Sequence, residues 1–429
     1  MTTNMIITLA IVIAMVVVII SDKLPFGAPA LLAAALLVVT NQIDVATAFS
    51  GFTDKNVIMI MGFMATMAAL QKTTFIHRLE GVLTKFAKKG GIVGFILLIL
   101  VIMAVGNFIS GTAFYILVIT LVSTIPYNKE LPTSRILIPS AFATYSSGWL
   151  PNSVVLFAGL VASLCESAGY TGDTTINVGK FCLMNLAWSV VYLIWAVIAH
   201  KFLPDRDISD NKENDELAGG KKEFVKTLSD TQETVVYVLY VVMLLSLVFQ
   251  SKIPGEISYG LPILIAGVYM CVGALSFKEM LGSMFSPVMI MMASVIGVAQ
   301  GMAASGLSAF IGGKIAGILG ASPSLFVLVL IFALLTSILA TFTGASFGSL
   351  FITGPIGIAL CMQYGLNPVP LALACVKSAW INYFMPIDGM PALTMGVGKY
   401  KLTEFWRFVL PMWILNMLTV VSLSVILFQ

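Results

Sequence analysis

The sequence has few charged residues, and it lacks the cysteine and basic patterns that form disulfide frameworks or nucleic-acid sites. Asp, Glu, Lys and Arg make up 10% of the 429 residues, whereas a soluble domain carries about 25%. The five cysteines are odd in number and form no C-x-x-C pair, so they indicate small buried residues rather than a disulfide framework. No basic run is interleaved with aromatic residues, so nothing indicates nucleic-acid binding.

Apolar residues fill the chain instead. Hydrophobic residues make up 59% of the sequence and the mean hydropathy is +1.00, which leaves too little polar surface for water and makes lipid the solvent. Met1-Thr2-Thr3-Asn4 carries no positive side chain, and no small-residue cleavage site follows Ile20. We therefore expect the first apolar stretch to be a membrane helix rather than a signal peptide.

The lengths of the apolar stretches, and the polar, Gly and Pro residues that separate them, predict an all-α polytopic membrane protein with ten crossing segments. We expect uninterrupted spans over 5–20, 28–42, 56–71, 176–202, 233–250, 258–275, 285–303 and 407–428, and broken spans over 136–165 and 369–398. Two apolar pairs, 91–108 with 113–126 and 323–341 with 346–362, are expected to be re-entrant hairpins. Residues 75–89 have the amphipathic pattern of a helix lying in the membrane interface.

The sequence also repeats itself. Ser110-Gly111-Thr112-Ala113-Phe114 is echoed by Thr343-Gly344-Ala345-Ser346-Phe347, and Val57–Met61 is echoed by Val288–Met292 at a nearly equal offset. These matches predict two duplicated halves, 1–202 and 232–429, joined by a polar linker over 203–231. Duplicated halves with interrupted apolar helices are typical of secondary transporters.

Charge placement predicts that the two halves are inverted. With the N-terminus outside and non-crossing hairpins, most of the 23 Lys and Arg residues fall on the inner side, as the positive-inside rule requires. Only Lys55, Lys180, Lys252 and Lys314 fall outside. We expect a cell-membrane protein with both termini outside and the basic loops and the 203–231 linker in the cytoplasm.

The interruptions are the candidate site. Broken backbone at mid-membrane depth persists where it is buried or lines a polar cavity, and a hairpin tip exposes the positive N-terminus of its second helix. The tips at 110–112 and 343–346 are therefore expected to bind an anion, and Pro151 and Pro391 suit restarted helices. Carbonyls near Gly148 and Met385 could bind a small cation. The alternative is that these Gly/Ser/Thr clusters only permit close helix packing.

Together these residues resemble the divalent anion/sodium symporters, the dicarboxylate and sulfate carriers of the ion-transporter superfamily. The resemblance covers nearly the whole chain and includes Gly51-Phe52, the amphipathic 75–89 segment, both tips, Leu150-Pro151-Asn152, and Met385-Pro386 through Lys401 to Phe405. It implies a homodimer that carries substrate by an elevator motion. Gly111 and Gly344 stand where that family has asparagine, which leaves backbone groups to bind the ligands.

The resemblance and the interruptions give two candidate residue sets. The substrate set is Ser110, Gly111, Thr112, Pro151, Asn152, Thr343, Gly344, Ala345, Ser346, Lys377 and Pro391. The set for the coupling cation, sodium first and a proton second, is Ser110, Gly111, Gly148, Thr343, Gly344 and Asp388. No other cofactor is expected.

Lys377 and Asp388 are charged residues inside a span, which makes them functional candidates. We expect the Lys377 ammonium either to attract the anion or to occupy a cation site, with pairing to nearby carbonyls as the structural alternative. For Asp388 the two alternatives are a ligand for a cation or a proton and the N-cap of a helix.

The sequence thus predicts a secondary transporter of a small organic or divalent anion, with dicarboxylate-like chemistry. The alternatives are a cation/proton or metalloid-anion antiporter of the same superfamily, and a non-transporting membrane scaffold. Gly344–Gly348 matches the G-x-S-x-G hydrolase pattern in letters only. That pattern needs a strand and a histidine, and His77 and His200 are expected at the inner membrane face, so we expect no enzyme.

Overall fold

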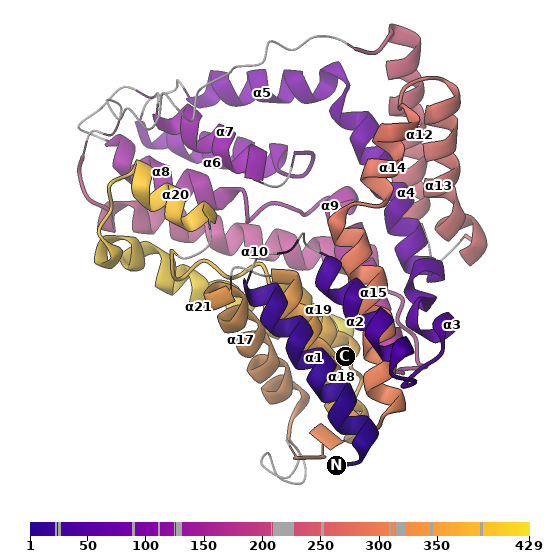
Figure 1. The fold of residues 1–429 in the computed structure, drawn as a ribbon. Helices are drawn as coiled ribbons and strands as arrows, with labels where there is room; N and C mark the ends of the chain where they lie inside the picture. Colours follow the sequence, from indigo (N-terminus) through magenta and orange to yellow (C-terminus); the bar gives the residue numbers. More distant parts are fainter. Residues whose placement is uncertain are drawn as a thin grey trace.

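The computed structural model describes the chain except residues 22–23, 25–26, 88–90, 110–111, 124, 126–130, 207, 209–226, 250–252, 309, 312, 315–322, 344–345 and 387–388. The described residues form helices and connecting turns without strands (Figure 1). Among them, five helical stretches are long and apolar enough to cross a membrane: Val178–Phe202, Phe277–Ala304, Leu325–Phe342, Ser346–Gln363 and Leu402–Phe428. The all-α membrane fold is confirmed.

The first half follows the expected order closely. Its helices are α1 (Thr3–Ser21), α2 (Ala28–Val39), α3 (Val45–Ala48), η1 (Ser50–Thr53), α4 (Lys55–Gln71), α5 (Thr74–Ala87), α6 (Gly91–Val105), α7 (Thr112–Ser123), α8 (Thr133–Ala143), α9 (Pro151–Ser167), α10 (Val178–Ala199) and η2 (His200–Phe202). The short α3 and η1 were not expected from hydropathy, because four-residue helices carry no measurable periodicity.

The second half repeats this order. Its helices are α12 (Asp230–Val248), α13 (Gly255–Cys271), α14 (Phe277–Met284), α15 (Pro287–Ala304), α17 (Leu325–Thr343), α18 (Ser346–Gln363), α19 (Val369–Ser378), α20 (Gly389–Val397) and α21 (Leu402–Phe428). The unexpected α14 begins with a capping box, in which Ser276 and Glu279 satisfy each other's backbone amides. α17 and α18 are each long enough to cross a bilayer, so length does not separate a re-entrant hairpin from two crossings.

The helices form two groups, which we call the frame and the bundle. The frame comprises α1–α4 and α12–α15, in which α4 packs on α13 and α15 packs on α2. The bundle comprises α6–α10 and α17–α21, and α5 runs from the frame along α6 (Figure 1). Within the bundle, α9 packs on α19 and α8 packs on α20, so each broken helix of one half lies against its counterpart.

Contacts along the frame give the direction of each half. Lys55 lies over the ring of Tyr259 and Lys72 donates to the Ala274 carbonyl, so α4 and α13 run parallel. η1, which leads into α4, packs on α15, and there Ser50 is bonded to Gln300 in the last turns of that helix. The N-terminal end of α4 therefore lies beside the C-terminal end of its counterpart α15, as inverted halves require.

Glycines permit the closest frame contacts. A Cβ on Gly51 would lie 2.0 Å from the Ala293 carbonyl oxygen, and one on Gly297 would lie 1.8 Å from that of Ala48. No larger residue fits at these two positions without moving backbone, so the α3–η1 segment is fixed against α15.

Side-chain bonds define two ends of the molecule. At the end that we call the terminal end, Lys55 pairs with Glu166, and Lys180 and Asn367 bond the carbonyls of Leu427 and Phe428. At the opposite end, which we call the linker end, Arg206 pairs with Glu404 and Lys72 pairs with Glu279. The expected outer loops, 166–175 and 363–368, thus share one end with the last residues. Which side of a membrane that end faces stays a prediction.

Candidate substrate and ion site at the helix interruptions

The first hairpin is bonded to the first broken helix through Asn107. This residue follows α6, is 3% exposed, and accepts the Leu150 amide at 2.9 Å through its side-chain oxygen. Its backbone carbonyl accepts hydrogen bonds from the Asn152 side-chain amide and, at 3.0 Å, from the Ser153 hydroxyl. These bonds satisfy the exposed backbone where the chain re-enters a helix at Pro151, so the α6 turn and the start of α9 form one unit.

The break between α8 and α9 is held from behind by α10. Gly148 has φ +100°, a conformation that favours glycine, and its carbonyl accepts the Asn185 side-chain amide at 2.6 Å. One turn along α10, Ser189 bonds the Ser146 carbonyl. We expected the Gly148 carbonyl to bind a cation. Asn185 occupies one of the two lone pairs of this carbonyl oxygen.

The second interruption has the same plan with different side chains. Asn382, in the break after α19, donates to the Ser346 hydroxyl at the start of α18 at 3.3 Å, which joins the second tip to the second break. α21, the counterpart of α10, supports this break: the Trp413 indole donates to the Ser337 hydroxyl at 2.8 Å and to the Ile381 carbonyl at 3.1 Å, and Trp406 donates to the Phe384 carbonyl.

The two halves meet across these interruptions. Tyr115, in the first turns of α7, is hydrogen-bonded to Thr394 of α20. On the other side, the Trp380 ring in the second break lies between Phe157 of α9 and Phe347 of α18, with centroid separations of 5.0 and 4.9 Å. The hairpin of each half therefore contacts the broken helix of the other half, through α7 with α20 and through α18 with α9.

Lys377 is buried between the two broken helices. It is 6% exposed and lies in α19, all of whose residues are buried. Its ammonium lies 4.3 Å from the Trp188 ring centroid and 5.1 Å from that of Phe157. Among the described residues no carboxylate or carbonyl accepts a hydrogen bond from it, so the structural alternative of pairing with local carbonyls is not seen there; its described neighbours are two aromatic faces, which attract a cation.

The predicted site residues divide into those the structure describes and those it does not. Pro151 begins α9, Pro391 lies in the first turn of α20, and Gly148, Asn152, Ser346 and Lys377 surround the breaks. Residues outside the description are Ser110, Gly111, Gly344, Ala345 and Asp388, together with the side chains of Thr112 and Thr343.

Asn107 and Asn382 were missed by sequence reasoning. Asn107 lies four residues before Gly111, where the resemblance has asparagine, whereas Asn382 lies in the break after α19 and far in sequence from Gly344. A buried amide close to each interruption was the available signal, since an unpaired amide is costly in lipid. The side-chain oxygen of Asn152, 4% exposed, and the Tyr240 hydroxyl of α12 make no well-formed hydrogen bond to a described residue, although the two side chains lie beside each other.

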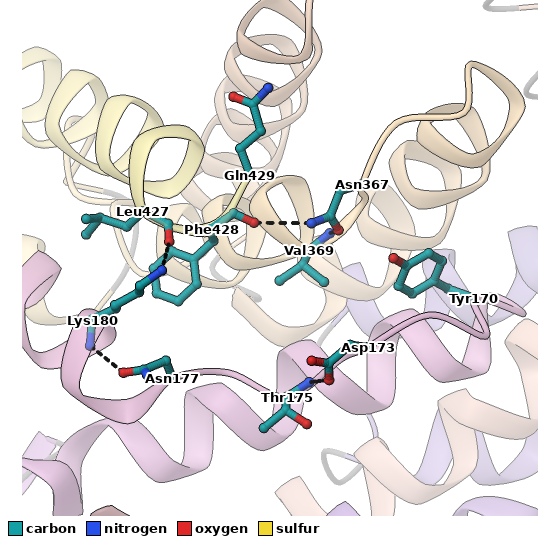
Figure 2. A pocket seen from close by; sticks show the side chains of 10 residues that line it. All are labelled: Tyr170, Asp173, Thr175, Asn177, Lys180, Asn367, Val369, Leu427, Phe428 and Gln429. Atoms are coloured by element: carbon teal, nitrogen blue, oxygen red, sulfur yellow. Dashed lines mark hydrogen bonds between the residues drawn. The ribbon is translucent and has the colours of Figure 1, made fainter. Parts of the chain in front are cut away.

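A separate polar pocket lies at the terminal end. It measures about 260 Å³ and is lined by Tyr170, Asp173, Thr175, Asn177, Lys180, Asn367, Val369, Leu427, Phe428 and Gln429 (Figure 2). It is formed by the turn before α10, the loop before α19 and the end of α21, so it does not coincide with the interruptions. In the described part of the chain, no three His, Cys, Asp or Glu side chains gather to hold a metal ion.

Comparison with known proteins defines the class. Two curated relatives are described as uncharacterized transporters: YfbS of Escherichia coli strain K12, 24% identical over 191 residues, and sll0640 of Synechocystis sp. strain ATCC 27184 / PCC 6803 / Kazusa, 23% identical over 204 residues. These matches cover 43% and 47% of this chain, and the chain spans only 30% and 33% of the relatives' length. The chain is a multi-pass membrane protein similar to transporters. Residues 16–284 match the family model described as CitMHS, Citrate transporter, and the chain belongs to this family.

Solved structures share the fold over nearly the whole chain. The YdaH transporter of Alcanivorax borkumensis has a TM-score of 0.62 at 15% identity, covering 96% of this chain and 98% of its own. The Neisseria gonorrhoeae protein MtrF, described in a study of antimetabolite efflux pumps, has a TM-score of 0.59 at 13% identity, covering 100% of this chain and 95% of its own. The narrower resemblance to divalent anion/sodium symporters stays a prediction.

Proposed function

We propose that the protein is a secondary active transporter of a small di- or tricarboxylate or a similar divalent anion, coupled to a cation. The observation that carries the proposal is the paired construction of the interruptions. Each hairpin is bonded to a broken helix, through Asn107 in one half and Asn382 in the other, and both pairs meet in one bundle.

The chemistry of the interruptions favours an anionic substrate. Two restarted helices, α9 and α20, and two second hairpin helices, α7 and α18, begin at the interruptions. Each start carries about half a positive charge from its backbone amides, which favours carboxylate groups. The Asn152 side-chain oxygen, beside the Tyr240 hydroxyl, is an acceptor in the same region, suited to a substrate hydroxyl or a cation.

The packing of bundle on frame supports alternating access. α9 packs on α4, α12 and α15, and α18 packs on α1, whereas α7, α8 and α20 have no comparable packing with a frame helix in the described part of the chain. The bundle is therefore attached to the frame on one side only, as expected for a body that slides along a fixed partner. We infer an elevator motion, with a homodimer built through the frame.

Purified protein tests the substrate class. Citrate, succinate, sulfate and an alkyl sulfonate are added separately, with sodium or with potassium, and the melting temperature is measured. A ligand at about 100 times its Kd stabilises the folded state by about 2.7 kcal/mol. A shift with one or more of these anions supports the proposal, and no shift with any of them under either cation contradicts it.

Two tip variants locate the binding event. Gly111→Val and Gly344→Val place a branched side chain where backbone is expected to approach the anion. Loss of the anion-induced shift in both, with the melting temperature of the free protein retained, supports a site at the tips. Gly260→Val is the control, because a Cβ there meets no neighbouring atom within 4 Å. Unchanged shifts in both tip variants would move the site elsewhere.

A further inference from the structure

Lys377 has no neutralising partner among the described residues, although it is one of the most buried charged side chains of the bundle. It is the penultimate residue of α19, so its ammonium lies where the second broken helix stops. The contacts recorded for its nitrogen are the faces of Trp188 and Phe157. Aromatic faces attract a cation but bring no opposite charge, so the net charge of this region changes whenever the amine binds or releases a proton.

The ionisable groups on the helices packed around Lys377 do not supply that charge. α17 has none, and the other packed helices carry Cys165 and Glu166 on α9, Lys180, Cys182 and Tyr192 on α10, Cys361 on α18, Cys375 on α19, and Glu404 and Arg407 on α21. Glu166 pairs with Lys55 at the terminal end, and Glu404 pairs with Arg206 at the linker end. Glu166 is nine residues beyond Phe157, about 13 Å along α9.

Two buried polar atoms link Lys377 to the first interruption. The Trp188 indole nitrogen and the Asn185 side-chain oxygen have no hydrogen-bond partner among the described residues, at 3% and 2% exposure. They are three residues apart on α10, hence on the same face. Asn185 donates to the Gly148 carbonyl, so one face of α10 contacts Lys377 through Trp188 and fixes the first break through Asn185.

Lys377 is separated from the second tip by aromatic rings. Phe157 contacts the ammonium and packs on Trp380, which in turn packs on Phe347 at the start of α18. These rings lie between the ammonium and the start of α18, so the described contacts of Lys377 are with aromatic faces that hold its charge without neutralising it.

We propose that Lys377 is the proton carrier of the transport cycle, a role that rests on the proposed function and names its coupling ion. The amine binds a proton from water on one side of the membrane, and the resulting ammonium is held by Trp188 and Phe157. It returns the same proton to water on the other side and becomes a neutral amine. A lysine suits this task because, unlike arginine, it can lose its charge.

The first test needs no substrate. Tryptophan fluorescence of the purified full-length protein is titrated from about pH 5 to pH 10, the range over which a perturbed amine titrates. We expect a transition in the wild type that is absent from Lys377→Met, Lys377→Arg and Trp188→Phe. Lys180→Met, which removes an exposed lysine at the start of α10, retains it. A transition that persists in Lys377→Met, or a wild type without one, overturns the proposal.

The second test measures coupling. Vesicles containing the protein and a trapped pH dye are given labelled citrate, in potassium buffer without sodium. The wild type is expected to acidify or alkalinise the lumen in step with citrate, and Lys377→Arg to lower proton movement at least tenfold. If Lys377→Met does not fold, the arginine variant still decides, because it keeps the charge and the aromatic contacts. Wild-type proton movement in Lys377→Arg overturns the proposal.

The two tests fail separately. If citrate, succinate and sulfate neither bind nor move, the proposed function fails. The fluorescence titration still decides whether Lys377 binds and releases a proton. If citrate moves with sodium and without protons, the transporter stands and the proton role of Lys377 is lost.

Discussion

The Lys55 ammonium lies 3.1 Å from the Glu166 carboxylate and joins the start of frame helix α4 to the end of bundle helix α9. Asn56 and Thr174 also donate to Glu166, at 3.3 and 3.0 Å, and Ser163 donates to Asp54 at 3.1 Å. The bonds from Lys55 and Asn56 to Glu166, and from Ser163 to Asp54, connect frame and bundle at the terminal end, where a sliding bundle would have to release them.

Glu166→Gln is expected to favour the state in which this end is open. The lysine side chain is 54% exposed and the glutamate 27%, so the pair is worth at most about 1 kcal/mol, which changes the ratio of two states about fivefold. Ile60 is buried under α9, where it lies against Gly159. The measurement is the rate at which an impermeant maleimide labels Ile60→Cys in a protein whose native cysteines have been replaced. Asp173→Asn is the control, and equal rates in all variants would mean that the pair does not restrain the bundle.

Asp54 gives a pH-dependent prediction. Burial, reinforced by the nearby Glu166 charge, raises the pKa of this carboxyl, although the Val57 and Asn56 amides and Ser163 oppose the shift. Because the folded-state pKa is raised, the ionised carboxylate costs stability at neutral pH, and that cost disappears as the pH falls through the folded-state pKa. Asp54→Asn keeps a helix cap without the charge. Its melting temperature should equal or exceed the wild-type value at pH 7, and the difference should shrink toward about pH 4. A difference that grows in acid would contradict this account.

Asn107→Ala should uncouple the first hairpin from the first break. The substitution leaves the half-buried Leu150 amide without its acceptor, which costs at most about 1–3 kcal/mol. We expect a lower melting temperature and loss of citrate-induced stabilisation. Asn107→Asp, which keeps the acceptor, should recover part of the stability. Asn382→Ala is the matched variant in the second half, where the bond of 3.3 Å is longer, and its effect should be smaller. Wild-type binding in Asn107→Ala would remove this residue from the site.

Membrane orientation is tested by labelling from outside intact cells. Asp173→Cys and Asn367→Cys lie in the two loops of the terminal end, which the distribution of Lys and Arg predicts to be extracellular. We expect both to react with an impermeant reagent before permeabilisation, and Lys201→Cys, at the linker end, only afterwards. The reverse pattern would invert the topology, and opposite behaviour of the two loops would contradict the inverted repeat.

Composition and apolar patterning alone gave the membrane class, the order of the long helices and the positions of both interruptions. A helical chain crosses hydrocarbon as long apolar segments, so the predicted spans 176–202 and 407–428 are visible in composition alone, and a Gly/Pro-rich break such as Gly148–Pro151 stands out against them. Duplication placed the second interruption once the first was recognised. The match to a transporter family agrees with this level of description.

Only the tertiary structure decided which side chains meet. Asn107 and Leu150 are far apart in sequence, as are Asn185 and Gly148, and Lys377 and Trp188, and no periodicity relates them. A buried polar group must find a partner, but sequence does not say which, because the choice follows from helix packing across the two halves. For the same reason Lys377 was recognised as a charged residue within a span, whereas its aromatic surroundings and its distance from a carboxylate emerged from the packing of α9, α10 and α19.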